Sequence, residues 1–137
     1  MIVTLEDLLI MARTIWGEAR GESPEGRMAV GWVIRNRLTQ HHRKENTIAG
    51  VCTEPYQFSC WLDSDPNRIK LLSVDTKDDL FRLCLMAAIQ ALIPNGVDIT
   101  HGATHYHVTN MANPPQWAIG HSPTAIIGSH SFFRGIA

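Results

Sequence analysis

The stretch WGEARGESPEG, residues 16–26, carries three carboxylates and three glycines and separates two amphipathic segments. Glycines followed by a Ser-Pro pair are typical of a place where one helix ends and the next begins. A carboxylate at the end of a packed helix can be partly desolvated, which raises its pKa and makes it a proton donor near neutral pH. The stretch therefore predicts a helical pair with a candidate acid at its junction.

The segment before this stretch predicts an amphipathic helix. Thr4 and Asp7 have the spacing of an N-cap and its partner. Apolar residues then recur three and four positions apart. They are Leu5, Leu8, Leu9, Ala12, Ile15 and Trp16. On the same helical wheel Glu18 lies at the border of the buried face, and Gly17 and Gly21 indicate that the helix ends soon after it.

The segment after the stretch predicts a second helix. Ser23 is suited to the N-cap and Pro24 to the first helical position. The apolar stripe consists of Met28, Ala29, Trp32, Val33 and Leu38. We expect the two helices to pack as neighbours, followed by a polar connection that opens at His41 and His42.

The middle of the chain has weaker patterns and one further strong helix. Residues 47–52 favour a short helical turn, 55–61 an aromatic-rich loop and 63–67 a turn. Thr76 and Asp79 have the spacing of a helix cap. The expected core side of the helix that follows is Leu80, Phe81, Cys84, Leu85, Ala88 and Leu92, and residues 94–96 end it.

The last forty residues change character, because alternating patterns replace helical ones. Residues 103–109 and 124–133 each read as a strand, and a loop at 113–117 lies between them. The sequence thus predicts an α+β fold for residues 1–137, a mostly helical single domain with a small C-terminal β-hairpin or sheet.

Composition excludes several classes of partner. The 137 residues carry a net charge of −1 and no basic stripe, so nucleic acid is not an expected partner. Three cysteines without a CxxC pair predict free thiols rather than disulfides. Neither a membrane-spanning apolar run nor a signal peptide is visible, so we expect a protein that is made in the cytoplasm and has no stable membrane insertion. We also expect a monomer.

Three carboxylates at the junction face different environments. Glu18 has an apolar flank, which favours its protonated form, whereas Glu22 and Glu25 lie near the N-terminus of the second helix, where the macrodipole favours ionisation. An acid and a base held apart in this way are typical of enzymes that cleave glycosidic bonds. The spacing alone leaves open that all three are ordinary turn and cap residues.

Motifs along nearly the whole chain point to a family. The segment EARGE at 18–22 is followed by TIAGV at 47–51, QFS at 57–59, His105-Tyr106, and IGSHSF at 127–132. In this combination the chain resembles the spore cortex-lytic (SleB-type) family of cell-wall hydrolases. Its short form is similar to phage or prophage versions, such as endolysins.

The resemblance implies a lysozyme-like catalytic domain that cleaves peptidoglycan glycan strands between N-acetylmuramic acid and N-acetylglucosamine. It places the essential acid at Glu18, which would act as general acid and then base in a lytic transglycosylase, leaving 1,6-anhydro-muramyl ends. No cofactor is implied. Access to the wall would need holin-dependent export or delivery in a virion. A hydrolytic muramidase is the alternative, and it needs a second carboxylate roughly 5–9 Å away, for which Glu22, Asp63 and Asp65 are candidates.

Several further residues are expected to bind substrate. Gln57, Phe58 and Ser59 would form a groove wall, with the alternative that Phe58 belongs to the core. Tyr106 and His107 point to opposite faces of a strand, so only one should line the groove, and Tyr106 is our choice. Trp117 would stack on a sugar or cover the hairpin, and Glu22 completes the predicted set.

Histidines are abundant in the last third of the chain. They are His101, His105, His107, His121 and His130. A zinc amidase that cuts the peptide stem would use such residues. Their spacing matches no strong zinc signature, so no metal site is predicted. A phage component that binds glycan without cutting it is the remaining alternative.

Overall fold

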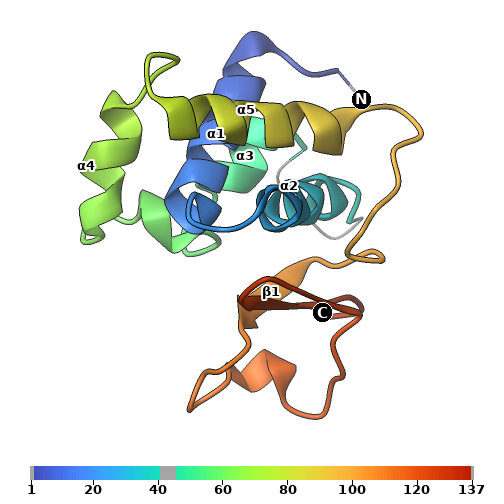
Figure 1. Ribbon diagram of the computed structural model, residues 1–137. Coiled ribbons are helices and arrows are strands. Elements are labelled where there is room, and N and C mark those ends of the chain that lie inside the picture. The colour runs from blue at the N-terminus through green and yellow to red at the C-terminus, as the bar shows by residue number, and fades with distance from the viewer. Residues whose placement is uncertain (1, 41–45, 137) are drawn as a thin grey trace.

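The computed structural model describes residues 2–40 and 46–136 and arranges them in two layers, helices above and a small sheet below (Figure 1). The helices are α1 (Leu5–Ala19), α2 (Pro24–Leu38), α3 (Ile48–Thr53), the short 3₁₀ helix η1 (Ser59–Trp61), α4 (Pro66–Ser73) and α5 (Asp79–Leu92). The other layer holds β1 (His105–Val108), the 3₁₀ helix η2 (Gln116–Ala118), β2 (Ala125–Ile127) and β3 (His130–Phe133). The predicted α+β class is confirmed.

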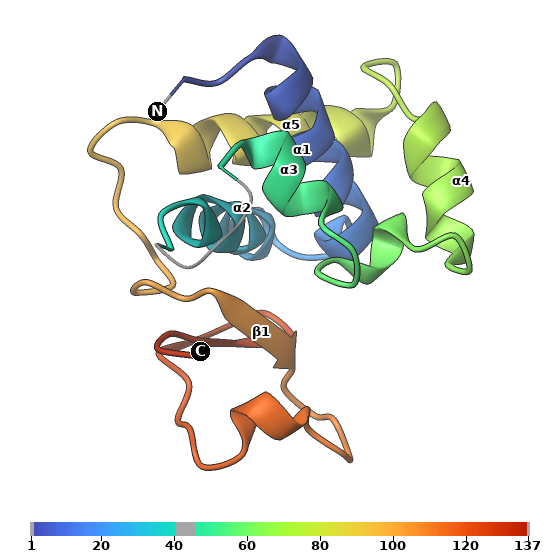
Figure 2. The same ribbon diagram turned by 180° about the vertical axis from the view of Figure 1, so that it is seen from behind.

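Helix α1 is the central element of the helical layer. Thr4 and Asp7 form a reciprocal capping box at its start, as predicted. Met11 and Ile15 are fully buried where α1 packs against α2, α3 and α5, and Figure 2 shows α3 lying against α1 and α2 from behind. Leu5, which the predicted stripe included, is 71% exposed because the first turn of the helix projects beyond its neighbours.

Helix α2 begins as the sequence predicts and packs beside α1. The Ser23 hydroxyl accepts a hydrogen bond from the Gly26 N–H, and Pro24 occupies the first turn. The buried residues Val30 and Ile34 join the main core. The expected polar connection at His41 and His42 lies outside the described residues.

Two helical predictions need correction. The region predicted only as a turn at 63–67 starts α4, which Asp65 caps and which Arg13 holds by donating hydrogen bonds to the carbonyl oxygens of Leu71 and Val74. A helix this short has little periodicity, so the tertiary anchor at Arg13 escapes a pattern search. The cap of α5 is Asp78 rather than the Thr76–Asp79 pair, and Leu80 is exposed.

The sheet is antiparallel with strand order β1-β3-β2. The region 124–133, predicted as one strand, is two strands joined by a tight turn at Gly128 and Ser129. Gly128 has φ +59°, a left-handed conformation that favours glycine. Trp117, expected in a loop, lies in η2.

A second apolar cluster joins the two layers. Ala29 and Val33 of α2 pack against Ala103 and Phe132. The end of α2 also holds the start of β1 by hydrogen bonds, because the Asn36 amide donates to the Ala103 carbonyl and the Arg37 guanidinium to the Thr104 carbonyl. The sheet is thereby fixed under the C-terminal end of α2.

All three cysteines are free and buried, which agrees with the predicted absence of disulfides. Burial raises the pKa of the Cys52 thiol to about 12 and that of the Cys84 thiol to about 11. Within the described ranges, no helix is long and apolar enough to cross a membrane.

Candidate active site

A cavity of about 480 Å³ lies between the C-terminal end of α1 and strand β1. Helical elements, the sheet and the loop that carries η2 all contribute to its wall. The lining residues are Gly17, Glu18, Ser59, Asn67, Tyr106, His107, Val108, Met111, Pro115, Trp117 and His130. Its size suits a ligand of a few hundred Å³, with polar groups on an aromatic wall.

Glu18 is half-buried in the last turn of α1 and binds two hydrogen-bond donors. The Tyr106 hydroxyl donates to Glu18 Oε1 at 2.7 Å, and the Cys60 N–H donates to Oε2 at 3.4 Å. The donors come from β1 and η1, so three separate elements meet at this carboxylate.

Gly17 is required for this arrangement. A Cβ atom at this position would lie 2.6 Å from the Cβ and 2.8 Å from the Sγ of Cys60. The absence of a side chain therefore lets η1 approach α1 closely enough for its backbone to reach Glu18.

Tyr106 and Cys60 both stay protonated beside Glu18. Burial raises the pKa of the Tyr106 hydroxyl well above its usual value, and the neighbouring Glu18 charge adds to the shift. The same two causes raise the pKa of the Cys60 thiol. Tyr106 is consequently a neutral hydrogen-bond donor at any working pH, and Cys60 does not supply a thiolate nucleophile.

Glu22 lies outside the cavity and points to the β2–β3 turn. Its carboxylate accepts hydrogen bonds from the N–H of Ser129 at 3.0 Å and from the Ser129 hydroxyl at 2.9 Å. Burial alone would raise the pKa of Glu22, but these bonds and the nearby His130 outweigh it, and the pKa is lowered.

A second cavity of about 260 Å³ adjoins the first. It is lined by Arg37, Tyr56, Gln57, His105, Tyr106 and Trp117. Tyr106 and Trp117 line both cavities, so the two cavities share part of their wall.

Four of the predicted binding residues line the cavities, whereas Phe58 and Glu22 line neither of them. Ser59 lines the first cavity, Gln57 the second, and Tyr106 and Trp117 both. For Phe58 the stated alternative, a place in the core, is confirmed, because its ring is only 2% exposed and packs beneath the Arg37 guanidinium.

The prediction that only one of Tyr106 and His107 lines the groove is wrong, because both side chains line the first cavity. Strand β1 is at the edge of the sheet, and the cavity extends over that edge. The rings of His105 and His107 pack on Trp117 at centroid distances of 5.0 and 5.8 Å, so Trp117 covers the sheet as well as lining the cavities.

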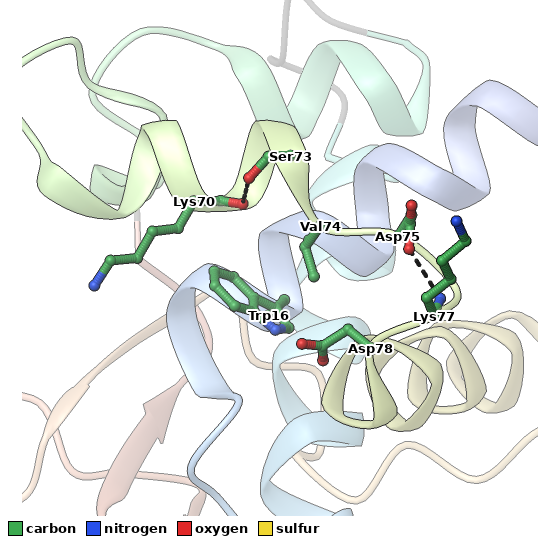
Figure 3. A pocket seen from close by; sticks show the side chains of 7 residues that line it. All are labelled: Trp16, Lys70, Ser73, Val74, Asp75, Lys77 and Asp78. Carbon is green, nitrogen blue, oxygen red and sulfur yellow. Dashed lines mark hydrogen bonds between the residues drawn. The ribbon is translucent and has the colours of Figure 1, made fainter.

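A further cavity, of about 540 Å³, lies elsewhere, between α1, α4 and the start of α5 (Figure 3). It shares no lining residue with the two cavities beside Glu18. Its acids have structural roles, since Asp75 accepts a hydrogen bond from the Lys77 N–H and Asp78 caps α5. We therefore place the candidate active site at Glu18.

A family comparison covers most of the chain. The family described as Cell Wall Hydrolase matches residues 21–133, which is most of the chain. This chain is a member of the cell wall hydrolase family. The resemblance inferred from the sequence motifs is thus confirmed.

Individual relatives of this cell wall hydrolase support the same family assignment. The spore cortex-lytic enzyme of Bacillus subtilis (strain 168) is 32% identical over 126 residues, which cover 92% of this chain and 37% of that enzyme. The spore cortex-lytic enzyme of Halalkalibacterium halodurans is 33% identical, over 92% of this chain and 34% of that enzyme. The chain therefore spans about a third of the length of these relatives.

Solved structures show the same fold. The catalytic domain of the Bacillus cereus SleB protein matches with a TM-score of 0.78 and 28% identity, over 97% of this chain and 93% of that one. The catalytic domain of the germination-specific lytic transglycosylase SleB from Bacillus anthracis matches with a TM-score of 0.74 and 27% identity, over 96% of both chains. The expected lysozyme-like, mostly helical architecture is confirmed.

Sequence reasoning missed parts of the hydrolase site. The Cys60 N–H could not be foreseen, because a backbone donor leaves no signal in residue type. His130 stood out only as one of many histidines, although it lies within the IGSHSF motif. Asn67, which lines the first cavity, receives a hydrogen bond from Arg20 at 2.9 Å, and only the fold brings these two together.

Proposed function

We propose that this cell wall hydrolase cleaves the glycan strand of peptidoglycan as a lytic transglycosylase, with Glu18 as general acid and base. One observation carries the proposal. Among the residues that the structure describes, Glu18 is the single carboxylate lining the two adjoining cavities. A transglycosylase needs only one catalytic carboxylate, whereas hydrolysis normally uses a pair.

The surroundings of Glu18 suit both halves of such a reaction. Protonated Glu18 first gives its proton to the oxygen of the glycosidic bond between N-acetylmuramic acid and N-acetylglucosamine, and that bond breaks. Tyr106 and the Cys60 N–H then stabilise the negative charge that forms on Glu18. The carboxylate next takes the proton of the muramyl C6 hydroxyl, whose oxygen closes the anhydro ring. Glu18 ends the cycle protonated, so no water is consumed.

The candidates for a second carboxylate are engaged elsewhere. Glu22 is bound to Ser129, and Asp65 caps α4 through the Asn67 N–H. The side chain of Asp63 is 94% exposed beside Arg68. These positions support the transglycosylase over the hydrolytic muramidase.

Digestion of purified peptidoglycan followed by mass spectrometry tests the proposal. We expect fragments with anhydro-muramyl ends. Fragments with reducing ends would replace the transglycosylase by a hydrolase, and released stem peptides on intact glycan would replace it by an amidase. Binding without any cleavage would indicate a glycan-binding protein.

A matched pair of variants tests the role of Glu18. Glu18→Gln should lower the cleavage rate by about 10²–10⁴-fold, the usual contribution of general acid–base catalysis. Glu25→Gln removes an exposed carboxylate seven positions along the chain and should leave the rate unchanged. Retained activity in Glu18→Gln would refute the assignment.

A further inference from the structure

The β2–β3 turn is fastened to the helical layer through one side chain, Glu22. Both oxygens of Glu22 accept the Ser129 hydroxyl at 2.9 Å, and Oε1 also accepts the Ser129 N–H at 3.0 Å. The turn fits tightly, since a Cβ atom on Gly128 would lie 2.6 Å from Glu22 Oε1. Glu22 itself lies just beyond the end of α1, only four residues after Glu18.

His130 extends this contact into the cavity. It follows Ser129 at the start of β3, is 7% exposed, and lines the first cavity. Its Nδ1 atom is buried without a hydrogen bond and lies 3.6 Å from Glu22 Oε1. The edge of the imidazole packs against the ring of Tyr106 at a centroid distance of 5.0 Å. A continuous series of contacts therefore runs from Glu22 through His130 to Tyr106, and from its hydroxyl to Glu18.

Besides contacting His130, the ring of Tyr106 packs against both apolar clusters of the fold. Phe132 packs on it at 5.5 Å, and this residue pairs with Tyr106 across the β1–β3 ladder. Phe132 and His130 both belong to β3, whose turn Glu22 holds. A shift of that turn would consequently move both aromatic neighbours of Tyr106 together.

We propose that Glu22 is a positioning residue, which fixes Ser129 and His130 so that the ring of Tyr106 keeps its hydroxyl on Glu18. This inference rests on the proposed function, because it assigns Glu22 a part in the same reaction. Glu22 lines neither cavity beside Glu18, so it acts on the rate through Tyr106 and not through contact with the glycan.

A double-mutant cycle on soluble peptidoglycan glycan fragments tests the coupling. Glu22→Gln and Tyr106→Phe should each lower kcat about tenfold or more, with little change in KM. Since both changes remove the same interaction, the double variant should be no slower than the slower single variant. A double variant whose loss equals the product of the single losses would overturn the proposal, as would a Glu22→Gln enzyme with wild-type kcat. Glu25→Gln, which changes an exposed carboxylate, is the matched control.

A nuclear magnetic resonance titration tests the same contacts without requiring activity. Burial lowers the pKa of His130, His107 lowers it further, and the carboxylates of Glu22 and Glu18 oppose the shift. In Glu22→Gln the imidazole should titrate at a lower pH than in the wild type, and the ring signals of Tyr106 should move. Glu25→Gln should leave both unchanged.

The two measurements separate the two proposals. A wild-type protein that cleaves no glycan would end the proposed function, while the titration would still show whether Glu22 holds His130 and Tyr106. Unchanged His130 and Tyr106 signals in Glu22→Gln would overturn the positioning role whatever the activity. If Glu22→Gln does not fold, Ser129→Ala removes only the hydroxyl donor, and it should show the same changes to a smaller degree.

Discussion

The substitution Gly17→Ala probes how the Glu18 carboxylate is held. The added Cβ atom would lie 2.6 Å from Cys60 Cβ, whereas ordinary contacts begin at 3.4 Å. The Cβ atom of Cys60 is bonded directly to the backbone and cannot swing aside, so η1 must move away from α1 by nearly 1 Å. Overpacking of this kind costs about 1–3 kcal/mol, and the better helix propensity of alanine returns up to about 1 kcal/mol. The net loss of stability is at most about 3 kcal/mol, or several degrees in Tm.

We expect Gly17→Ala to lower the cleavage rate as well, because the substitution removes a contact to Glu18. The Cys60 N–H lies 3.4 Å from Glu18 Oε2, already near the limit for a hydrogen bond, so a further shift of this size breaks the contact. Hydrogen bonds to charged groups contribute about 1.5–3 kcal/mol, and the lower figure applies to so long a contact, which corresponds to a drop of roughly tenfold in the cleavage rate.

Calorimetry and a glycan-cleavage assay on three variants test this reasoning. Gly21→Ala is the control, because nothing lies within 4 Å of the new Cβ atom. Gly17→Ala combined with Cys60→Gly removes the clash and should recover part of the activity. A Gly17→Ala protein with wild-type Tm and rate would refute the argument that close approach of η1 positions Glu18.

Three further outcomes are expected. Tyr106→Phe removes the 2.7 Å hydrogen bond to Glu18 and should slow cleavage about 10–100-fold in steady-state assays, and an unchanged rate would remove Tyr106 from the site. Trp117→Ala should raise KM by up to about tenfold, because this ring walls both cavities and aromatic contacts contribute about 0.5–1.5 kcal/mol, whereas a change in kcat alone would contradict a binding role. Burial would raise the pKa of Asp98, but hydrogen bonds from Thr100 and its neighbours outweigh it, and the pKa is lowered below 3.8. The stabilisation from Asp98 is therefore present above pH 3.8 and lost as the pH falls below it, so thermal melts of Asp98→Asn should show lower stability at neutral pH and a weaker acid dependence than the wild type.

The predictable parts of this protein are those that short stretches of chain determine. The starts of α1 and α2 follow from Thr4, Asp7 and Ser23, because each cap is a contact within three residues. The position of Glu18 at a helix end follows from the same local patterns. Local hydrogen bonding and helical periodicity need no knowledge of the rest of the fold.

The parts that escaped prediction depend on contacts distant in sequence. Helix α4 is held by Arg13, more than fifty residues away, and Glu22 binds Ser129 at a separation of 107 residues. Phe58 was misplaced because an aromatic residue in a loop carries no mark of whether its ring faces the core or a groove. Residue type indicated the chemistry of the site, but partners across the two layers determine which side chains reach it.

The rates at which the three buried thiols react with a reagent report how often this fold opens. A thiol reagent must wait until the protein opens, so its rate of reaction measures the free energy of that opening. All three lie in the main apolar cluster, but Cys52 and Cys84 belong to helices α3 and α5 and should react only on global unfolding. Cys60 is equally buried but belongs to η1, beside Glu18. Faster labelling of Cys60 than of the other two would measure directly how often the end of α1 that carries Glu18 loses its backbone support while the rest of the molecule stays folded.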